Sequence, residues 1–233
     1  MGSVGSKGFQ QFSSEAQHSL AYKSDNRKTD SWFKEHTNVD SVLDDLSDAE
    51  YLAFYHWTHG DFEHGEQYSP FNEMPSKHQS DTKIFDEFID KSTLDTGILV
   101  HRRSTPELLF GKDKKLVTED DLKSIIGKNI LSPANLSTSA ASEGLQIGLA
   151  PDVNHPYYKQ IEYAIRVPAG RGNGIYLNTK RGSLQVEDQR EFMLRRDVVL
   201  KPVSYQVLGD GAHGRPQYKV VLELVKKNPH KYD

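Results

Sequence analysis

The sequence contains no cysteine among its 233 residues. Disulfide bonds, thiolate metal sites and a cysteine nucleophile are therefore excluded. No apolar run is long enough to cross a bilayer, and the opening residues, MGSVGSKGFQQFSSEAQ, lack the apolar core of a secretory signal. A basic excess is also absent, since 29 Lys and Arg stand against 33 Asp and Glu, for a net charge of −4. This balance disfavours a duplex nucleic-acid binder, although it leaves room for local basic patches.

The order of the expected elements indicates an α+β fold. Residues 1–30 are rich in Ser, Gly, Gln and Lys, and we interpret them as a flexible lead-in or linker before a single domain over residues 31–233. Apolar periodicity and turn residues predict helices first and then many short strands, which is typical of α+β proteins with mixed or antiparallel sheets. The expected helices cover residues 41–46, 47–58, 83–89, 104–111 and 118–127, and the expected strands cover residues 97–102, 135–139, 160–167, 175–177, 191–194, 198–200, 204–208 and 218–225.

Two features of the N-terminal half have ordinary structural interpretations. Ser47 and Glu50 have the spacing of a capping box, and the helix that follows carries Tyr51, Phe54 and Tyr55 at helical spacing, which indicates core. Four histidines lie in or near the turn-rich segment 60–82, without the spacing of a metal site. We therefore expect solvated loop histidines and no bound metal; the four are His56, His59, His64 and His78.

Three polar features lie at the ends of expected strands. Arg102 ends a β-branched strand, and the segment 137–139 (Ser-Thr-Ser) forms a strand of its own. The stretch 182–194, GSLQVEDQREFML, is a glycine-led acidic loop that runs into an apolar strand. Gln189 and Glu191 thus lie where a loop that could meet a substrate joins a sheet that could fix a catalytic group. Alone, this stretch is more typical of a solvated turn.

Taken in order, these motifs resemble the mono-ADP-ribosyltransferase exotoxin family. The branch with the clostridial Rho-modifying exoenzymes and the enzymatic components of binary toxins carries an arginine, a Ser-Thr-Ser and a (Gln/Glu)-x-Glu motif in this order. Further matches span most of the chain from about residue 40. They are AEYLAFYHWTHG, with its aromatic-Thr pair, TPELLFG, which ends in Phe110-Gly111, and AIRVPAGRGNGIYL before the catalytic loop. The resemblance implies an ADP-ribosyltransferase-like fold, in which N-terminal helices pack on a two-sheet, mixed or antiparallel β core.

The resemblance also implies NAD as substrate and no metal. Family members cleave the bond between nicotinamide and ribose, through a transition state that resembles an oxocarbenium ion. Glu191 would be the carboxylate that stabilises this charge, and Ser137 would orient it. Arg102 would hold the pyrophosphate of NAD. Gln189 would contact the acceptor side chain, on the same face as Glu191 if the strand extends that far.

Other residues of the resemblance have weaker assignments. Thr138 and Ser139 would keep the wall of the NAD site in place, and Gly111 belongs to the segment that resembles the family's Phe-Gly. Arg103 competes with Arg102, which we prefer because the family arginine directly follows the residue that is here His101. Gln185 and Glu187 form a second Gln-x-Glu, at residues 185–187. We prefer the pair at 189–191 because residues 192 and 194 continue as an alternating strand.

Two departures from the family pattern concern the loops. An aromatic residue normally lies early in the loop before Gln-x-Glu, where this sequence has Leu184 or Val186, and this puts the acceptor in doubt. An aromatic usually lies near the nicotinamide after Ser-Thr-Ser. The nearest candidates here, Tyr157 and Tyr158, come late in the chain and stay unassigned.

The function that we expect is transfer of ADP-ribose to a protein of a target cell, such as a small GTPase or another nucleotide-binding protein. Gln189 in place of Glu resembles the Rho-modifying branch, which modifies asparagine. Alternatives are transfer to guanine in nucleic acid, which the net charge disfavours, and NAD glycohydrolysis. A non-catalytic binding module is a further class, against which the intact Arg102, Ser137 and Glu191 argue. The resemblance implies a monomer, secreted or delivered by a partner, a larger toxin or a phage, that acts in the cytosol.

Overall fold

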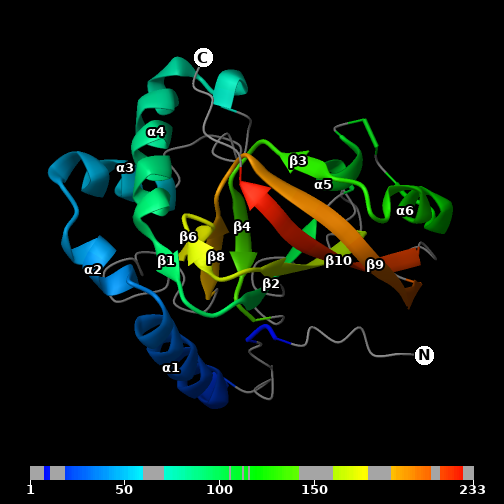
Figure 1. Cartoon of the computed structure of the whole chain (residues 1–233), viewed down its shortest axis with the longest axis horizontal. Helices are drawn as coiled ribbons and strands as arrows, with labels where there is room; N and C mark the ends of the chain where they lie inside the picture. Colours follow the sequence, from blue (N-terminus) through cyan, green and yellow to red (C-terminus); the bar gives the residue numbers. More distant parts are fainter. Residues whose placement is uncertain are drawn as a thin grey trace.

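The N-terminal helices α1 to α4 lie on one side of a large twisted sheet, and the short helices α5 and α6 lie on its opposite side (Figure 1). A computed structural model describes residues 8–10, 19–59, 71–104, 106–111, 113–114, 116–141, 160–177, 190–210 and 216–227. The helices are α1 (Ser19–His36), α2 (Val39–Asp44), α3 (Asp48–His59), a 3-10 turn (Phe71–Glu73), α4 (Ser76–Lys91), α5 (Glu107–Phe110) and α6 (Glu119–Ile125). The strands are β1 (Thr93–Leu94), β2 (Ile98–Ser104), β3 (Ile130–Ser132), β4 (Leu136–Ser139), β5 (Ile161–Val167), β6 (Gly170–Arg171), β7 (Gly174–Tyr176), β8 (Glu191–Leu194), β9 (Val198–Asp210) and β10 (Pro216–Lys227).

Eight of these strands form one mixed sheet, in the order β3-β9-β10-β5-β2-β4-β8-β7. Only β10 and β5 run parallel, and every other pair in this sheet is antiparallel. A second sheet pairs β1 with β6. The α+β class and the mixed sheet are therefore as expected, and β2, β4 and β8, which carry the polar motifs, are consecutive neighbours in the larger sheet.

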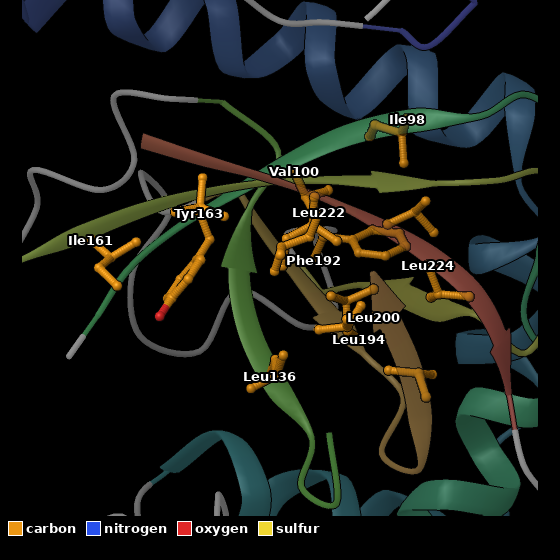
Figure 2. Close-up of a cluster of buried hydrophobic side chains, with 14 of the residues drawn as sticks. Ile98, Val100, Leu136, Ile161, Tyr163, Phe192, Leu194, Leu200, Leu222 and Leu224 are labelled. Carbon is orange, nitrogen blue, oxygen red and sulfur yellow. The ribbon is translucent and has the colours of Figure 1, made fainter. Parts of the chain in front are cut away.

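The main core lies on one face of this sheet (Figure 2). Alternate residues of β2 and β5 enter it, among them Val100 and Tyr163, because successive side chains of a strand point to opposite faces. Phe192 and Leu194 of β8 enter the same cluster. Glu191 and Met193 must therefore point to the other face of β8, where Met193 joins a second cluster with residues of α2, α3 and α4.

The second cluster shows which side of α3 is buried. Phe54 and Trp57 pack on α4, where the Trp57 ring stacks on Phe85 with a centroid distance of 4.4 Å. Tyr51 and Tyr55 are 53% and 37% exposed, so the prediction that they belong to the core was wrong. Four aromatic residues in seven positions cover more than the one face that α4 can bury. The capping box of Ser47 and Glu50 is confirmed by hydrogen bonds in both directions.

Helix α1 crosses the boundary that we expected at residue 31. Its residue Phe33 stacks on Tyr176 at a centroid distance of 3.8 Å, and the Tyr176 hydroxyl donates to Asp30 at 2.6 Å. Upstream, Gln10 forms a parallel bridge with Ile98 at the start of β2. Parts of the lead-in thus contact the sheet, while the division of the chain into a lead-in and one domain at residue 31 stays a prediction.

Strand β9 is longer than the sequence suggested. We expected two strands, over residues 198–200 and 204–208, with Pro202 in neither. Proline lacks the N–H that a strand ladder needs. The structure has one strand through this position, where Pro202 pairs with Leu222 at a register shift beside Val221. The Pro202 carbonyl also accepts a hydrogen bond from the Gly127 amide. The bulge accommodates the missing donor, so the strand bends without ending.

A buried ion pair joins α4 to the turn after β8. The Arg196 Nε donates to the Asp86 carboxylate at 2.6 Å, and both side chains are fully buried. Asn135, just before β4, accepts from the Arg196 amide and donates to Asp86. These contacts tie the ends of β4 and β8 to a helix, and so fix the two strands that carry Ser137 and Glu191. None of the helices in the described part of the chain has the length and apolar content needed to cross a membrane.

Replacement of Asp86 by Asn tests the weight of this ion pair. We expect Asp86→Asn to lower the free energy of unfolding by about 3–5 kcal/mol, because it leaves the Arg196 cation buried without its counter-charge. The measurement is urea denaturation followed by the fluorescence of Trp32 and Trp57. The double variant Asp86→Leu/Arg196→Met removes both charges and should lose less than the single variant.

The matched control is Asp120→Asn, which removes the carboxylate of an exposed pair with Lys123. It should leave the unfolding curve nearly unchanged, because exposed ion pairs contribute little. If Asp86→Asn also unfolds at the same urea concentration as the unmodified protein, the ion pair does not hold α4 to the sheet.

Candidate active site

The pairing of β4 with β8 brings Ser137 and Glu191 together. In this antiparallel register Ser139 lies opposite Glu191 and Ser137 lies opposite Met193, so all four side chains share a face of the sheet. The Ser137 hydroxyl donates a hydrogen bond of 2.6 Å to the Glu191 carboxylate. The two residues are 54 positions apart in the chain, and the contact is the one that the motif order predicted.

Arg102 lies beside this pair. Its Nη1 donates to the Ser137 carbonyl oxygen at 2.6 Å, and its positive charge acts on Glu191. Arg103 is the next residue of β2, opposite Glu162 of β5, and in the described part of the chain no contact joins its side chain to Ser137 or Glu191. The structure thus brings Arg102, and not Arg103, to Ser137 and Glu191.

The Glu191 carboxyl is under opposing influences. Burial raises its pKa, because a desolvated carboxylate is unfavourable, while the hydrogen bond from Ser137 and the charge of Arg102 lower it. Burial is the largest of these effects, so the pKa lies above the ordinary value for glutamate. The two neighbours favour the ionised form within a site that otherwise disfavours it.

Thr138 and Ser139 are buried and bond to backbone. The Thr138 hydroxyl donates to the Phe192 carbonyl oxygen, across the β4–β8 pair. The Ser139 hydroxyl accepts from the Ala141 amide at 3.2 Å, just beyond the end of β4. Both contacts fix the backbone around Ser137 and Glu191, while the part of Thr138 and Ser139 in the wall of an NAD site stays a prediction.

Gly111 has a local structural role. It ends α5 with a φ of +83°, a conformation that glycine adopts without strain, and its amide donates to the Glu107 carbonyl. Gly111 directly follows α5, so it closes this short helix as expected, while its part in an NAD site stays a prediction. Among the contacts of the described residues, none joins Gly111 to Ser137 or Glu191.

Gln189 lies outside the residues that the structure describes, as do Leu184, Gln185, Val186 and Glu187. Glu191 lies beside Ser137, and because Glu187 lies outside the described residues, the choice between the two Gln-x-Glu pairs stays a prediction. Gln189 was expected to share a face with Glu191 only if the strand extended that far. Strand β8 begins at Glu191 and Arg190 has a φ of +48°, so strand alternation does not extend back to Gln189. Tyr157 and Tyr158 also lie outside the described residues.

The histidines form no metal site in the described part of the chain, where no group of three or more His, Asp and Glu side chains is arranged to hold an ion. His56 instead pairs with Asp81 across α3 and α4, at 2.8 Å. His78 is buried on α4. These two are structural residues of the helical layer and not the solvated loop residues that we expected; His59 and His64 give no test, since His64 and the side chain of His59 are not described.

Sequence reasoning passed over Arg190, the middle residue of Gln-x-Glu. Its side chain is 2% exposed and its backbone is left-handed. Arginine in a charged segment is usually exposed, so the sequence pattern does not predict that the Arg190 side chain is buried. The Asp86–Arg196 pair was missed for a related reason, although a carboxylate between apolar positions of an amphipathic helix is a weak signal of it.

Known proteins resemble this chain in structure but not in sequence. No protein-family profile matches the sequence, and no curated protein matches it. Solved structures do match. Plx2a, an ADP-ribosyltransferase toxin from Paenibacillus larvae, superposes with a TM-score of 0.63 at 19% identity, over 87% of this chain and 97% of that chain. C3stau2 from S. aureus, solved with NAD, gives 0.60 at 14% identity, over 94% of this chain and 100% of that chain.

A longer protein matches over part of its length. The enzymatic component C2-I of the C2-toxin from Clostridium botulinum gives a TM-score of 0.60 at 13% identity, over 81% of this chain and 46% of that chain. The same architecture therefore occurs both as whole chains of this size and as part of larger toxins. This chain has the fold of the ADP-ribosyltransferase toxins, as the order of its motifs predicted.

Proposed function

We propose that this protein is an NAD-dependent mono-ADP-ribosyltransferase of the toxin or effector type, which transfers ADP-ribose to a protein acceptor. The observation that carries the proposal is the 2.6 Å hydrogen bond from Ser137 to Glu191, with Arg102 bonded to the same serine residue. The fold supports the enzyme class, and the three residues have the types and the order that this chemistry needs.

The reaction exchanges one bond at the ribose for another. The bond between C1′ and the nicotinamide nitrogen breaks, and nicotinamide leaves as a neutral molecule with the bonding electron pair. A nucleophilic atom of the acceptor bonds to C1′ and loses a proton. Positive charge grows on the ribose between these events, and the ionised Glu191 carboxylate would stabilise it.

The surroundings of Glu191 suit this task. An exposed carboxylate would interact weakly with the developing cation through water, whereas a half-buried one acts at lower effective dielectric. Burial also favours the neutral acid, which could not stabilise the cation. Ser137 and Arg102 oppose this effect, because the hydrogen bond and the positive charge both favour the ionised carboxylate.

Arg102 would bind the substrate as well. A planar guanidinium presents paired donors that fit the oxygens of a pyrophosphate. Its Nη1 is bonded to the Ser137 carbonyl, which fixes the plane of the group beside Glu191. NAD bound at Arg102 would thereby be held at the strand that orients Glu191.

The acceptor would be a protein side chain contacted by Gln189. Glutamine at this place resembles the Rho-modifying branch, so an asparagine acceptor on a small GTPase or another nucleotide-binding protein is the expected target. The net charge of −4 favours a protein over nucleic acid. Action in the cytosol of a target cell, after secretion or delivery, belongs to the same proposal.

Removal of the carboxylate gives the primary test. Glu191→Gln should lower nicotinamide release from NAD by a factor of about 10³ or more, as loss of a main electrostatic stabiliser does, while the fold stays intact. The assay incubates the protein with labelled NAD and a cell lysate. Label on protein supports the proposal, label on nucleic acid supports transfer to guanine, and nicotinamide release without label supports a glycohydrolase. Equal inertness of both proteins with an intact fold would contradict an enzymatic role.

The two neighbouring arginines provide a matched pair. Arg102→Ala should raise the KM for NAD by about tenfold or more, since a bidentate contact to an anion is lost. Arg103→Ala removes the same charge from the next residue of β2 and should change KM little. Steady-state nicotinamide release at varied NAD measures both. A larger effect at Arg103 would reverse the assignment.

The raised pKa of Glu191 predicts a pH-dependent stability. A carboxyl whose pKa is higher in the folded than in the unfolded protein contributes stability in the acid range, and that contribution is lost as the pH rises through the folded pKa. The unmodified protein should therefore lose stability relative to Glu191→Gln as the pH rises from about 4, near the unfolded pKa of glutamate. Urea denaturation of both proteins across pH 4 to 8 measures the difference, and a gain of the unmodified protein with rising pH would contradict the burial effect.

A further inference from the structure

Arg190 combines a buried cationic side chain with a left-handed backbone, directly before Glu191. Its φ is +48°, and the side chain is 2% exposed. Residues other than glycine adopt this region seldom, and β-branched residues hardly at all. A large side chain kept in such a conformation indicates that the surroundings require it.

The carbonyl group of Arg190 is hydrogen-bonded to the sheet. Its carbonyl oxygen accepts from the Ala140 amide at 2.8 Å, which continues the β4–β8 ladder by one residue. The next carbonyl, of Glu191, accepts from the Leu177 amide at 2.9 Å, on the β7 side. The Arg190 side chain is anchored by its burial. The peptide and the side chain are thus held from three directions.

With these contacts in place, the φ of Arg190 determines the direction of the chain that precedes it. φ is the torsion about the N–Cα bond, so with the carbonyl and the side chain fixed it decides where the peptide to residue 189 points. In an extended conformation residue 189 would continue β8 between β4 and β7. At +48° the backbone of Arg190 does not have the extended conformation that would continue the strand.

We propose that Arg190 is a positioning residue that fixes how the acceptor-contacting side of the loop is aimed at Glu191, and so determines how ADP-ribose is divided between the acceptor and water. This inference rests on the proposed function, because it takes Glu191 as the residue of NAD cleavage and residue 189 as the acceptor contact. NAD cleavage needs Glu191 and the fixed strands. Transfer needs in addition that the preceding chain enters at the right angle.

Asn and Val at position 190 separate the backbone conformation from the side chain. They have similar volumes, and both remove the guanidinium, but asparagine tolerates a positive φ whereas valine does not. We expect Arg190→Asn and Arg190→Val to release nicotinamide from NAD at similar rates. Label on lysate protein per nicotinamide released should be about tenfold lower for Arg190→Val, the ratio that corresponds to the usual cost of the left-handed conformation.

Asp197 supplies the control. It has a φ of +56° at the other end of β8, in the turn to β9. Asp197→Val introduces the same backbone conflict away from the loop, so it should lower the thermal midpoint without changing the ratio of label to nicotinamide. If Arg190→Val does not fold, Arg190→Gly and Arg190→Ala repeat the comparison with a smaller conflict and should differ in the same direction.

The outcomes separate this inference from the proposed function. Equal ratios for the asparagine and valine variants, and for the glycine and alanine variants, would overturn the inference while the unmodified protein still labels its acceptor. A fall in nicotinamide release that accounts for the whole loss of label would also overturn it, since Arg190 would then act on Glu191 itself. An unmodified protein that does not cleave NAD, or cleaves it without labelling protein, would contradict the proposed function and this inference with it.

Discussion

The hydrogen bond from Ser137 to Glu191 is the contact on which the candidate site depends. It exists because β4 and β8 are antiparallel neighbours in a register that places the serine and the glutamate on one face. A shift of one residue would turn either side chain toward the main core, where Leu136, Phe192 and Leu194 now pack. The apolar alternation of both strands therefore specifies the chemistry, because it determines which face each polar group can occupy.

The remaining structure holds this pair of strands in place. Arg102 ties β2 to the backbone of Ser137, and the Asp86–Arg196–Asn135 network ties the far ends of β4 and β8 to α4. On the main-core face of the sheet, Phe33 of α1 packs on Tyr176 and on Phe192. Phe192 is the residue that follows Glu191 in the chain. A half-buried carboxylate needs such support, since a strand that could move would let water reach the group and weaken its interaction with a developing cation. Helices α1 and α4 and strand β2 thus together hold the Ser137 and Glu191 side chains in place.

Much of this site could be predicted from the sequence, because the strands that carry it are indicated by short patterns of neighbouring residues. Arg102, Ser137 and Glu191 each stand at the end of an apolar strand or within one, so the strand that carries each residue follows from the apolar pattern, and their order along the chain predicts the fold. Other features depend on partners far away in the sequence. Asp86 and Arg196 are 110 residues apart, and whether Tyr51 faces α4 or solvent depends on where α4 packs. Backbone torsions at single residues, such as the left-handed Arg190 that ends the strand alternation before Gln189, depend on the fold around them and leave no trace in residue type.

A structure of the Glu191→Gln variant with NAD would test the central claim most directly, because this substitution slows cleavage and keeps the shape of the site. The account predicts that the ribose joined to nicotinamide lies in contact with residue 191 and that the pyrophosphate lies within hydrogen-bond distance of the Arg102 guanidinium. NAD bound elsewhere on the protein, or bound with its ribose away from residue 191, would contradict it.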